Sequence, residues 1–138
     1  MSINVRRVDY FRTEVEDTPG TAYQLLKRLS SHDVNLLAVS SMPLGPAHTQ
    51  FTLFPKNSEK LIQAAEHLNL TLVGPERAIL IHGDDRMGAL VECHLKLADA
   101  GINVFATNGV TDGEGRYGYV IHMRPDDLEA AANALDAK

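Results

Sequence analysis

The sequence contains very little cysteine and no long apolar run. Among its 138 residues, the single thiol belongs to Cys93. No intrachain disulfide can form, which suits a reducing compartment, and one cysteine alone cannot build a thiolate metal cluster. No apolar stretch approaches the roughly 20 residues that a membrane helix needs. Charges interrupt residues 2–9, so this stretch does not resemble a secretory signal. We therefore expect a cytoplasmic protein without a membrane partner.

An excess of positive charge is also missing. The formal net charge is −5, which disfavours nucleic acid as the main partner. Residues 115–120 resemble the aromatic strand of RNA-recognition motifs, which stack bases on such rings. The expected neighbouring strand, residues 78–81, carries no aromatic residue. We therefore interpret the tyrosines of 115–120 as packing residues and expect no nucleic-acid partner.

The sequence lacks the spacings that are typical of catalytic and metal sites. No two of its six histidines stand four apart on an expected helix, so spacing indicates no metal site. Strand pairing between His82 and His122 is the one arrangement left open. Cys93 and His94 are adjacent on a helix and point to different sides, which argues against a nucleophile–base dyad. His94 falls on the packed stripe and is interpreted as a core or interface residue. We expect no catalytic residue, no metal ligand and no cofactor.

An internal duplication is what the sequence does contain. Gly20 and Gly88 are 68 residues apart, and residues 34–37 (Val-Asn-Leu-Leu) correspond to residues 102–105 (Ile-Asn-Val-Phe) at the same offset. Two apolar helix stripes also recur, the second at an offset of 67 after a one-residue deletion. The first stripe of the first copy is Ala22, Leu25, Leu26 and Leu29. The second stripe is Leu61, Ala64, Ala65 and Leu68, and it recurs as Leu128, Ala131, Ala132 and Leu135.

The order of expected elements is strand, helix, strand, strand, helix, strand in the first copy. Strands are expected at residues 8–15, 34–41, 50–54 and 70–73, the last stopped by Gly74-Pro75. Asp17 or Thr18 is expected to cap the first helix, and Asn57 or Ser58 the second. The second copy restarts with a strand at 78–82 and continues with strands at 102–105 and 116–123.

The second copy ends three residues after Leu135, so its own last strand is missing. An open sheet edge promotes association. We expect residues 2–7, which precede the first repeat, or a strand of a second chain, to occupy that edge.

These patterns predict an α+β protein of two domains, residues 1–75 and 76–138. Each is expected to be a ferredoxin-like βαββαβ unit, the second without its own last strand, with an antiparallel sheet and helices on one face. A unit of about 68 residues buries only roughly 60% of its unfolded surface and is marginal alone. We therefore expect the sheets to pair edge to edge, within the chain or across a homodimer.

The chain resembles the ACT domain family over residues 8–136. The resemblance depends on Asp17-Thr18-Pro19-Gly20 and Asp85-Arg86-Met87-Gly88, which open the two helices, and on Asn35 and Asn103 at the start of the following strands. Members of this family are small-molecule sensors, usually for amino acids, and are often attached to metabolic enzymes. The resemblance implies side-by-side pairing of sheets and a ligand at the junction of the paired units.

The resemblance and helix physics together predict a ligand site. Glycine admits a close backbone approach, and the start of a helix favours a carboxylate. The asparagine amide offers a donor and an acceptor to the ligand's polar end. The expected ligand-binding residues are Asp17, Thr18, Pro19, Gly20, Asn35, Asp85, Met87, Gly88 and Asn103. The proline-bearing first turn is favoured over the second, and a plain helix entry is the alternative interpretation of each turn.

The sequence thus indicates a non-catalytic regulatory module under allosteric control by a small metabolite, most simply an amino acid. A metabolic enzyme or regulator is the expected macromolecular partner. Two alternatives remain open. One is an interaction module that binds no ligand, and the other is a small enzyme on a ferredoxin-like fold, with a histidine or Arg12 acting on a small acid.

Overall fold

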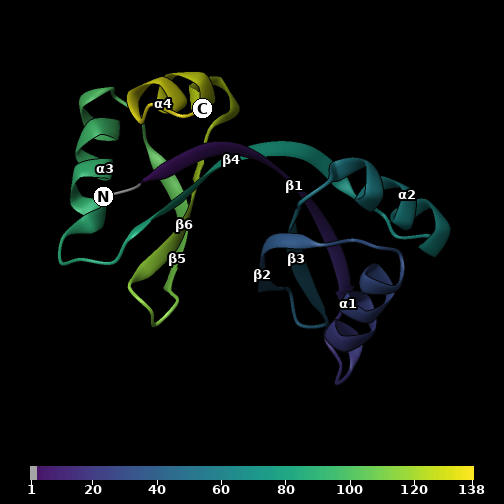
Figure 1. Cartoon of the computed structure of the whole chain (residues 1–138). Helices are drawn as coiled ribbons and strands as arrows, with labels where there is room; N and C mark the ends of the chain where they lie inside the picture. The colour runs from purple at the N-terminus through teal and green to yellow at the C-terminus, as the bar shows by residue number, and fades with distance from the viewer. Residues whose placement is uncertain (1–2) are drawn as a thin grey trace. The chain divides into compact units, whose positions relative to one another are not determined.

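The computed structural model describes residues 3–138, which form two compact units (Figure 1). The N-terminal unit comprises Asp9–Glu76, and the C-terminal unit comprises Arg77–Lys138 together with the chain up to Val8. The first residues of the chain therefore belong with its last ones. The expected domain bounds of 1–75 and 76–138 stay a prediction, and these compact units differ from them in the first eight residues and at Glu76.

The N-terminal unit carries two helices against an antiparallel sheet. Its elements are β1 (Asn4–Glu16), α1 (Thr21–Ser31), β2 (Leu36–Leu44), β3 (His48–Pro55) and α2 (Ser58–Leu68), with strands in the order β2-β3-β1. Alternate strand residues, Phe11, Phe51 and Leu53, form one buried cluster with helix residues. The helix residues of this cluster are Leu25, Leu29, Leu61 and Ala64. Both helices therefore cover the same face of the sheet.

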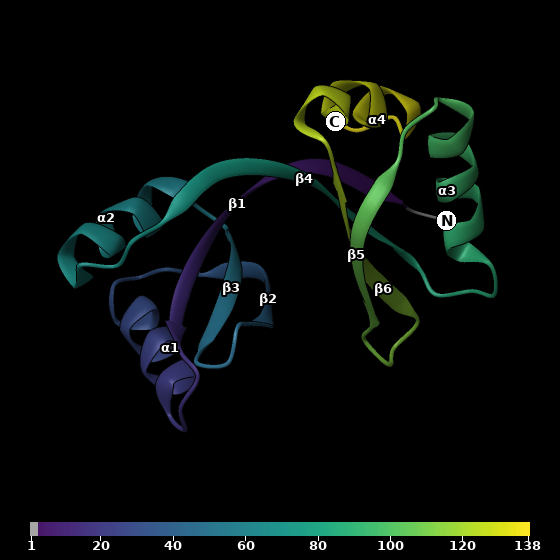
Figure 2. The same cartoon turned by 180° about the vertical axis from the view of Figure 1, so that it is seen from behind.

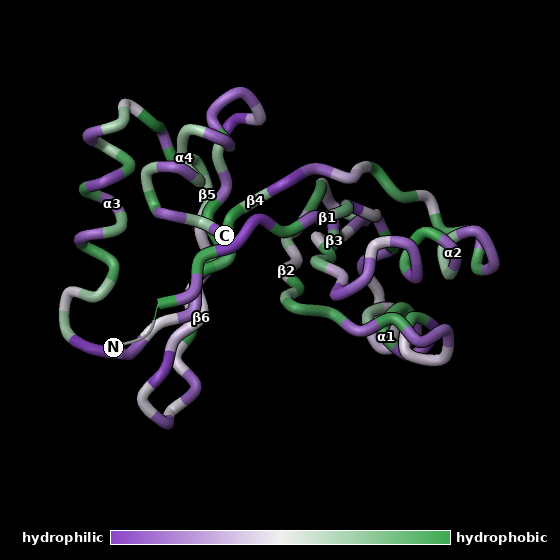
Figure 3. Tube along the Cα trace, turned by 45° about the horizontal axis from the view of Figure 1, so that its top comes forward, coloured by the Kyte–Doolittle hydropathy of each residue, from purple (hydrophilic) through white to green (hydrophobic). Residues whose placement is uncertain are grey.

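The C-terminal unit repeats this architecture (Figure 2). Its elements are β4 (Val73–Asp84), α3 (Ala89–Asp99), β5 (Val104–Thr111), β6 (Arg116–Met123), a 3₁₀ turn at Pro125–Asp127 and α4 (Leu128–Ala134). The strand order is β4-β6-β5, with antiparallel pairs. Its core joins Ile79, Ile81 and Ile121 of the sheet to Leu97 of α3 and Ala131 of α4. Hydrophobic and hydrophilic residues alternate along the elements of both units, as Figure 3 shows.

Strand register confirms the duplication. In the first copy Val15 lies opposite Thr49, and in the second Gly83 lies opposite Tyr117. Ser41 opposite Phe51 likewise corresponds to Gly109 opposite Tyr119. Both pairs stand 68 residues apart, and the pairing shifts register at the same place in β2 and in β5. The offset read from the sequence is therefore the offset of the hydrogen-bonded sheets, and the α+β class is confirmed.

The start of β1 occupies the edge that the second copy leaves open. β1 neighbours β4 in the hydrogen-bonded strand order. Val5 is buried in the core of the C-terminal unit, and its carbonyl accepts a hydrogen bond from the Lys138 N–H at 3.1 Å. The expectation for residues 2–7 is confirmed for Asn4–Arg7. Ser2 lies outside the described residues.

Two expectations about element ends are wrong. Residues 70–73 and 78–82 do not form two strands, because β4 begins at Val73 and runs through Gly74-Pro75 to Asp84. At Gly74 a Cβ would lie 2.8 Å from the Tyr10 carbonyl oxygen, so glycine here allows close strand approach and does not end the strand. Neither Asp17 nor Thr18 caps α1, because the N-cap is Gly20 in the left-handed region. Asn57 does cap α2 and accepts a hydrogen bond from the Lys60 N–H at 3.2 Å.

Within residues 3–138, every helix is too short or too polar to cross a membrane.

Candidate functional site

The turn between β4 and α3 brings exposed backbone to the start of a helix. Gly88 is the N-cap, with a φ of 76° that favours glycine, and it offers no side-chain cap. The Ala89 N–H donates to the Arg86 carbonyl and the Val91 N–H to the Gly88 carbonyl, both at 3.0 Å. Met87 is fully exposed. The turn is therefore hydrogen-bonded internally and exposed to solvent.

The turn before α1 has the same construction. Gly20 is its left-handed N-cap, with a φ of 88°. The Thr21 N–H donates to the Thr18 carbonyl at 3.2 Å, and the hydroxyls of these two threonines lie 2.6 Å apart. Asp17 and Pro19 are exposed. The two turns also meet the sheet alike, since the Asp17 N–H donates to the Ala47 carbonyl and the Asp85 N–H to the Gly115 carbonyl.

Tyr119 stands between α3 and β5. A Cβ on Gly109, its cross-strand neighbour, would lie 2.8 Å from the Tyr119 ring, so the ring rests directly on the glycine. The Tyr119 hydroxyl lies 2.8 Å from His94 Nε2, and the two rings meet edge to face at 5.7 Å between centroids. The sequence interpretation of His94 as a packing residue agrees with this contact, but the hydroxyl partner was missed. Counting outward from the expected 112–115 hairpin turn pairs Gly109 with Gly118, whereas the sheet pairs Thr111 with Tyr117 and so Gly109 with Tyr119.

Two cavities flank Tyr119 and share it as a wall. The first, of about 560 Å³, is lined by Asp85, Gly88 and Val110 among others. The second, of about 520 Å³, is lined by His94 and Asn103. We call the two together the α3–β5 groove. It brings three expected site residues, Asp85, Gly88 and Asn103, onto one surface, with the turn on one side of Tyr119 and the asparagine on the other.

The expected residues of the first copy have a different setting. Asn35 is exposed, and its carbonyl accepts a hydrogen bond from the Lys56 N–H at 2.8 Å. The cross-strand pair that corresponds to Gly109 and Tyr119 is Ser41 and Phe51, so phenylalanine stands where the second copy has the tyrosine hydroxyl. A cavity of about 540 Å³ in this unit lies instead against Arg12, Gln50 and Thr71. The preference for the proline-bearing turn stays a prediction, while the cavities favour the turn at Asp85–Gly88.

Cys93 and His94 face different spaces. Cys93 is buried and lines a cavity apart from the groove, whereas His94 lines the groove itself. Burial raises the pKa of the Cys93 thiol to about 11, against a smaller lowering by Lys96. The thiol is therefore protonated at neutral pH, and the two neighbours line different cavities, as adjacent positions on a helix predict.

The histidine pair left open by the sequence does not form. His82 lies opposite Gly118 on β6, four residues from His122 along that strand. Burial, with Arg6 and Arg116 adding, lowers the pKa of His82. Across residues 3–138, no three His, Cys, Asp or Glu side chains gather as a metal ion requires.

The fold of this chain is similar to solved structures, although its sequence matches no family model. No protein-family model and no curated protein matches the sequence.

Solved structures match over almost the whole chain. A protein from Bacteroides thetaiotaomicron superimposes with a TM-score of 0.81 at 15% identity, covering 96% of this chain and 89% of its own. The ligand-free regulatory subunit of aspartate kinase from Thermus thermophilus gives 0.65 at 18% identity, covering 99% and 95%. The corresponding subunit from Thermus flavus gives 0.60 at 14% identity, covering 98% and 94%. The likeness to tandem ACT domains that the two turns indicated is confirmed at the level of the fold.

Proposed function

We propose that this chain, which has the fold of aspartate kinase regulatory subunits, is a non-catalytic regulatory module that binds an amino acid in the α3–β5 groove. Each unit would be ACT-like and ferredoxin-like, with β1 completing the second. The observation that carries the proposal is the opening of the Asp85–Gly88 turn and Asn103 onto one groove beside Tyr119.

The groove supplies groups that suit an amino acid. A carboxylate is favoured at the start of α3, where Gly88 leaves the backbone accessible and no side chain caps the helix. The Asp85 carboxylate can accept a hydrogen bond from the ligand's ammonium group. Asn103 offers an amide, and the His94–Tyr119 pair offers a polar edge on an aromatic wall. The ligand's side chain would lie against Tyr119.

The groove lies on an apolar face that a second copy of this chain would cover. Val91 is 68% exposed and Val110 73% exposed, and Leu95 and Phe105 are exposed beside them. β5 is the last strand in the sheet order, so one of its edges is unpaired. An exposed apolar face next to an open strand edge favours association. We propose a homodimer in which ligand at the junction of paired units shifts the population toward one arrangement.

Of the two alternatives, the interaction module has the better support. The same apolar face would serve it without any ligand. Arg12 is less available for an enzymatic role, because it forms an ion pair with Glu76, whose carboxylate also accepts from the Tyr10 hydroxyl. A cytoplasmic location and a metabolic enzyme or regulator as partner remain proposals.

Thermal-shift measurements on the full chain test the amino-acid proposal. Each of the twenty amino acids is added at millimolar concentration, and at least one is expected to raise the melting temperature by several degrees, because ligand binds only the folded state. Silence from all twenty would favour the interaction module.

Two asparagine variants locate the site. Asn103→Ala is expected to weaken the identified amino acid at least tenfold, while the matched Asn35→Ala leaves its affinity unchanged. Both side chains belong to exposed residues, so both variants should fold. The reverse result would move the site to the proline-bearing turn.

A further inference from the structure

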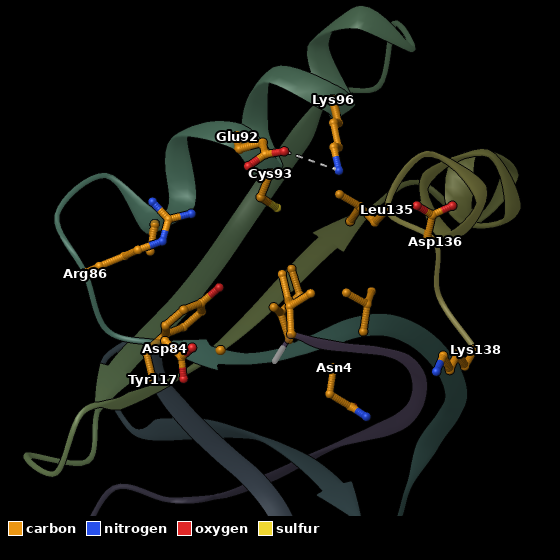
Figure 4. Close-up of a pocket in the computed structure, with 15 residues that line it drawn as sticks. Asn4, Asp84, Arg86, Glu92, Cys93, Lys96, Tyr117, Leu135, Asp136 and Lys138 are labelled. Atoms are coloured by element: carbon orange, nitrogen blue, oxygen red, sulfur yellow. Dashed lines mark ion pairs between the residues drawn. The ribbon is translucent and has the colours of Figure 1, made fainter. Parts of the chain in front are cut away.

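A separate cavity lies inside the C-terminal unit, on the opposite side of Tyr117 from the groove. Its volume is about 380 Å³, and we call it the inner cavity (Figure 4). The start of β1, the end of β4, one side of α3 and the residues after α4 enclose it. Its apolar lining includes Val5, Ile81, Ala89, Cys93 and Leu135. No residue of β5 lines it, although it shares Arg86, Ala89 and Tyr117 with the first cavity of the α3–β5 groove.

The duplication explains why this space exists. Gly83 and Cys93 line it, and their counterparts 68 residues earlier are Val15 and Leu25. Both counterparts pack into the core of the N-terminal unit. A Cβ on Gly83 would lie only 2.7 Å from the Tyr117 hydroxyl oxygen, so the Tyr117 side chain packs directly against the glycine. Cys93 is smaller than its counterpart Leu25 and leaves room beside α3, whereas the space beside Gly83 is filled by the Tyr117 side chain.

The polar groups around the inner cavity favour an anion. Figure 4 shows Arg86, Lys96 and the Tyr117 hydroxyl around the cavity, above its apolar floor. The Asp84 carboxylate is already neutralised by Arg116 at 2.7 Å. Lys96 is engaged only loosely and in solvent, at 3.6 Å from Glu92.

The other two charges on the wall, Asp136 and Lys138, oppose each other in sign. Glu92 also lines the cavity and offsets Lys96, so with Asp84 neutralised by Arg116 the lining carries an excess of one cationic group, Arg86, over an apolar floor.

We propose that the inner cavity binds a small carboxylate with an apolar chain. Its carboxylate would meet Arg86 and Lys96, and the Tyr117 hydroxyl would donate to it. Its branched or aromatic chain would lie on the floor beside Cys93. The volume falls within the roughly 300–1,000 Å³ of ligand pockets in general. This site goes beyond the proposed amino-acid groove and requires no second copy of the chain.

Three acids and one alcohol test the proposal on the full chain. Isovalerate, 4-methyl-2-oxopentanoate and 3-phenylpropionate are titrated to millimolar concentrations by calorimetry and by amide NMR. The neutral probe is 3-methylbutan-1-ol. At least one acid is expected to bind, with shifts concentrated at residues 81–86, 92–96 and 117, and the alcohol to bind at least tenfold more weakly. Absence of binding by all three acids, or shifts centred on 103–110, would overturn the proposal.

Variants separate this site from the groove. Cys93→Leu restores the first-copy residue and fills the cavity, so acid affinity should fall at least tenfold, while the matched Leu25→Cys leaves it unchanged. The stabilisation by an amino acid bound in the groove should survive Cys93→Leu, because Cys93 does not line the groove. If Cys93→Leu bound the acids with the affinity of the parent chain, the proposed site in the inner cavity would be wrong. Should that variant fail to fold, the exposed Lys96→Gln decides, since it must weaken the acids and spare the alcohol.

Discussion

Two tyrosines of β6 divide the space under α3. Tyr117 rests on Gly83 of β4 and Tyr119 on Gly109 of β5, each a directly paired cross-strand neighbour. An aromatic ring over a glycine covers backbone that would otherwise lie open, and it leans toward the strand that carries the glycine. Tyr117 lines both the inner cavity and the groove, and Tyr119 lines both cavities of the groove. Residue choice at two glycines thus decides where the unit is hollow.

At the residue scale, Gly109→Ala should destabilise the chain by about 1–3 kcal/mol, the usual cost of overpacking. The new methyl group would lie 2.8 Å from Tyr119 and displace its ring. Urea unfolding followed by circular dichroism measures the change. The control is Gly118→Ala in the same hairpin, where the nearest atom is His82 Cδ2 at an ordinary 3.6 Å. Equal losses for both variants would contradict the packing argument.

Helices α1, α2 and α3 begin in two different ways. α1 and α3 start at left-handed glycines without a side-chain cap, whereas α2 starts at Asn57, whose side chain accepts from the Lys60 N–H. An asparagine cap satisfies a helix donor internally. The glycine starts offer no side-chain acceptor, and at α3 the Ala89 and Val91 N–H groups donate to backbone carbonyls instead. The two kinds of start therefore separate helices that could meet a ligand from one that only packs.

At the element scale, Asn57→Ala should cost about 1 kcal/mol of unfolding free energy, because the Lys60 N–H loses its acceptor. The measurement is the urea midpoint at unchanged slope. Gln63→Ala, at an exposed position of the same helix, provides the control and should fall within about 0.5 kcal/mol of the parent. If Gln63→Ala lost as much unfolding free energy as Asn57→Ala, the effect would come from general helix propensity and not from the cap.

At the scale of the whole molecule, β1 serves both units. Its first residues belong to the C-terminal unit and its remaining residues to the N-terminal unit. The sheet of the second copy thereby gains β1 as the neighbour of β4, and Val5 enters its core. Because β1 pairs with this edge of the sheet, the edge is less exposed to association with another chain.

Val5→Ala should therefore destabilise the C-terminal unit by roughly 2 kcal/mol, from about 0.8 kcal/mol for each buried methylene lost plus a cavity contribution. Hydrogen exchange should quicken in residues 79–84 and stay unchanged in β3. Ile3→Ala is the matched control, since Ile3 is 65% exposed and Val5 only 6%. If both variants exchanged like the parent, β1 would not support this unit.

The sequence by itself determined the repeat, its offset of 68 and the α+β class, because apolar stripes, turn glycines and strand alternation are local signals. It also determined that residues before the first repeat were surplus, and the tertiary structure then decided where they go. The passage of β4 through Gly74-Pro75, the glycine caps, and the Gly83–Tyr117 and Gly109–Tyr119 contacts appear only in three dimensions. The caps depend on the left-handed backbone at Gly20 and Gly88. The close approach at Gly74 and the Gly83–Tyr117 contact depend on which distant backbone lies across the sheet, and the Gly109–Tyr119 contact depends on the register of the hairpin. For the same reason, the sequence favoured the turn with proline, whereas the cavities gather around the turn without it.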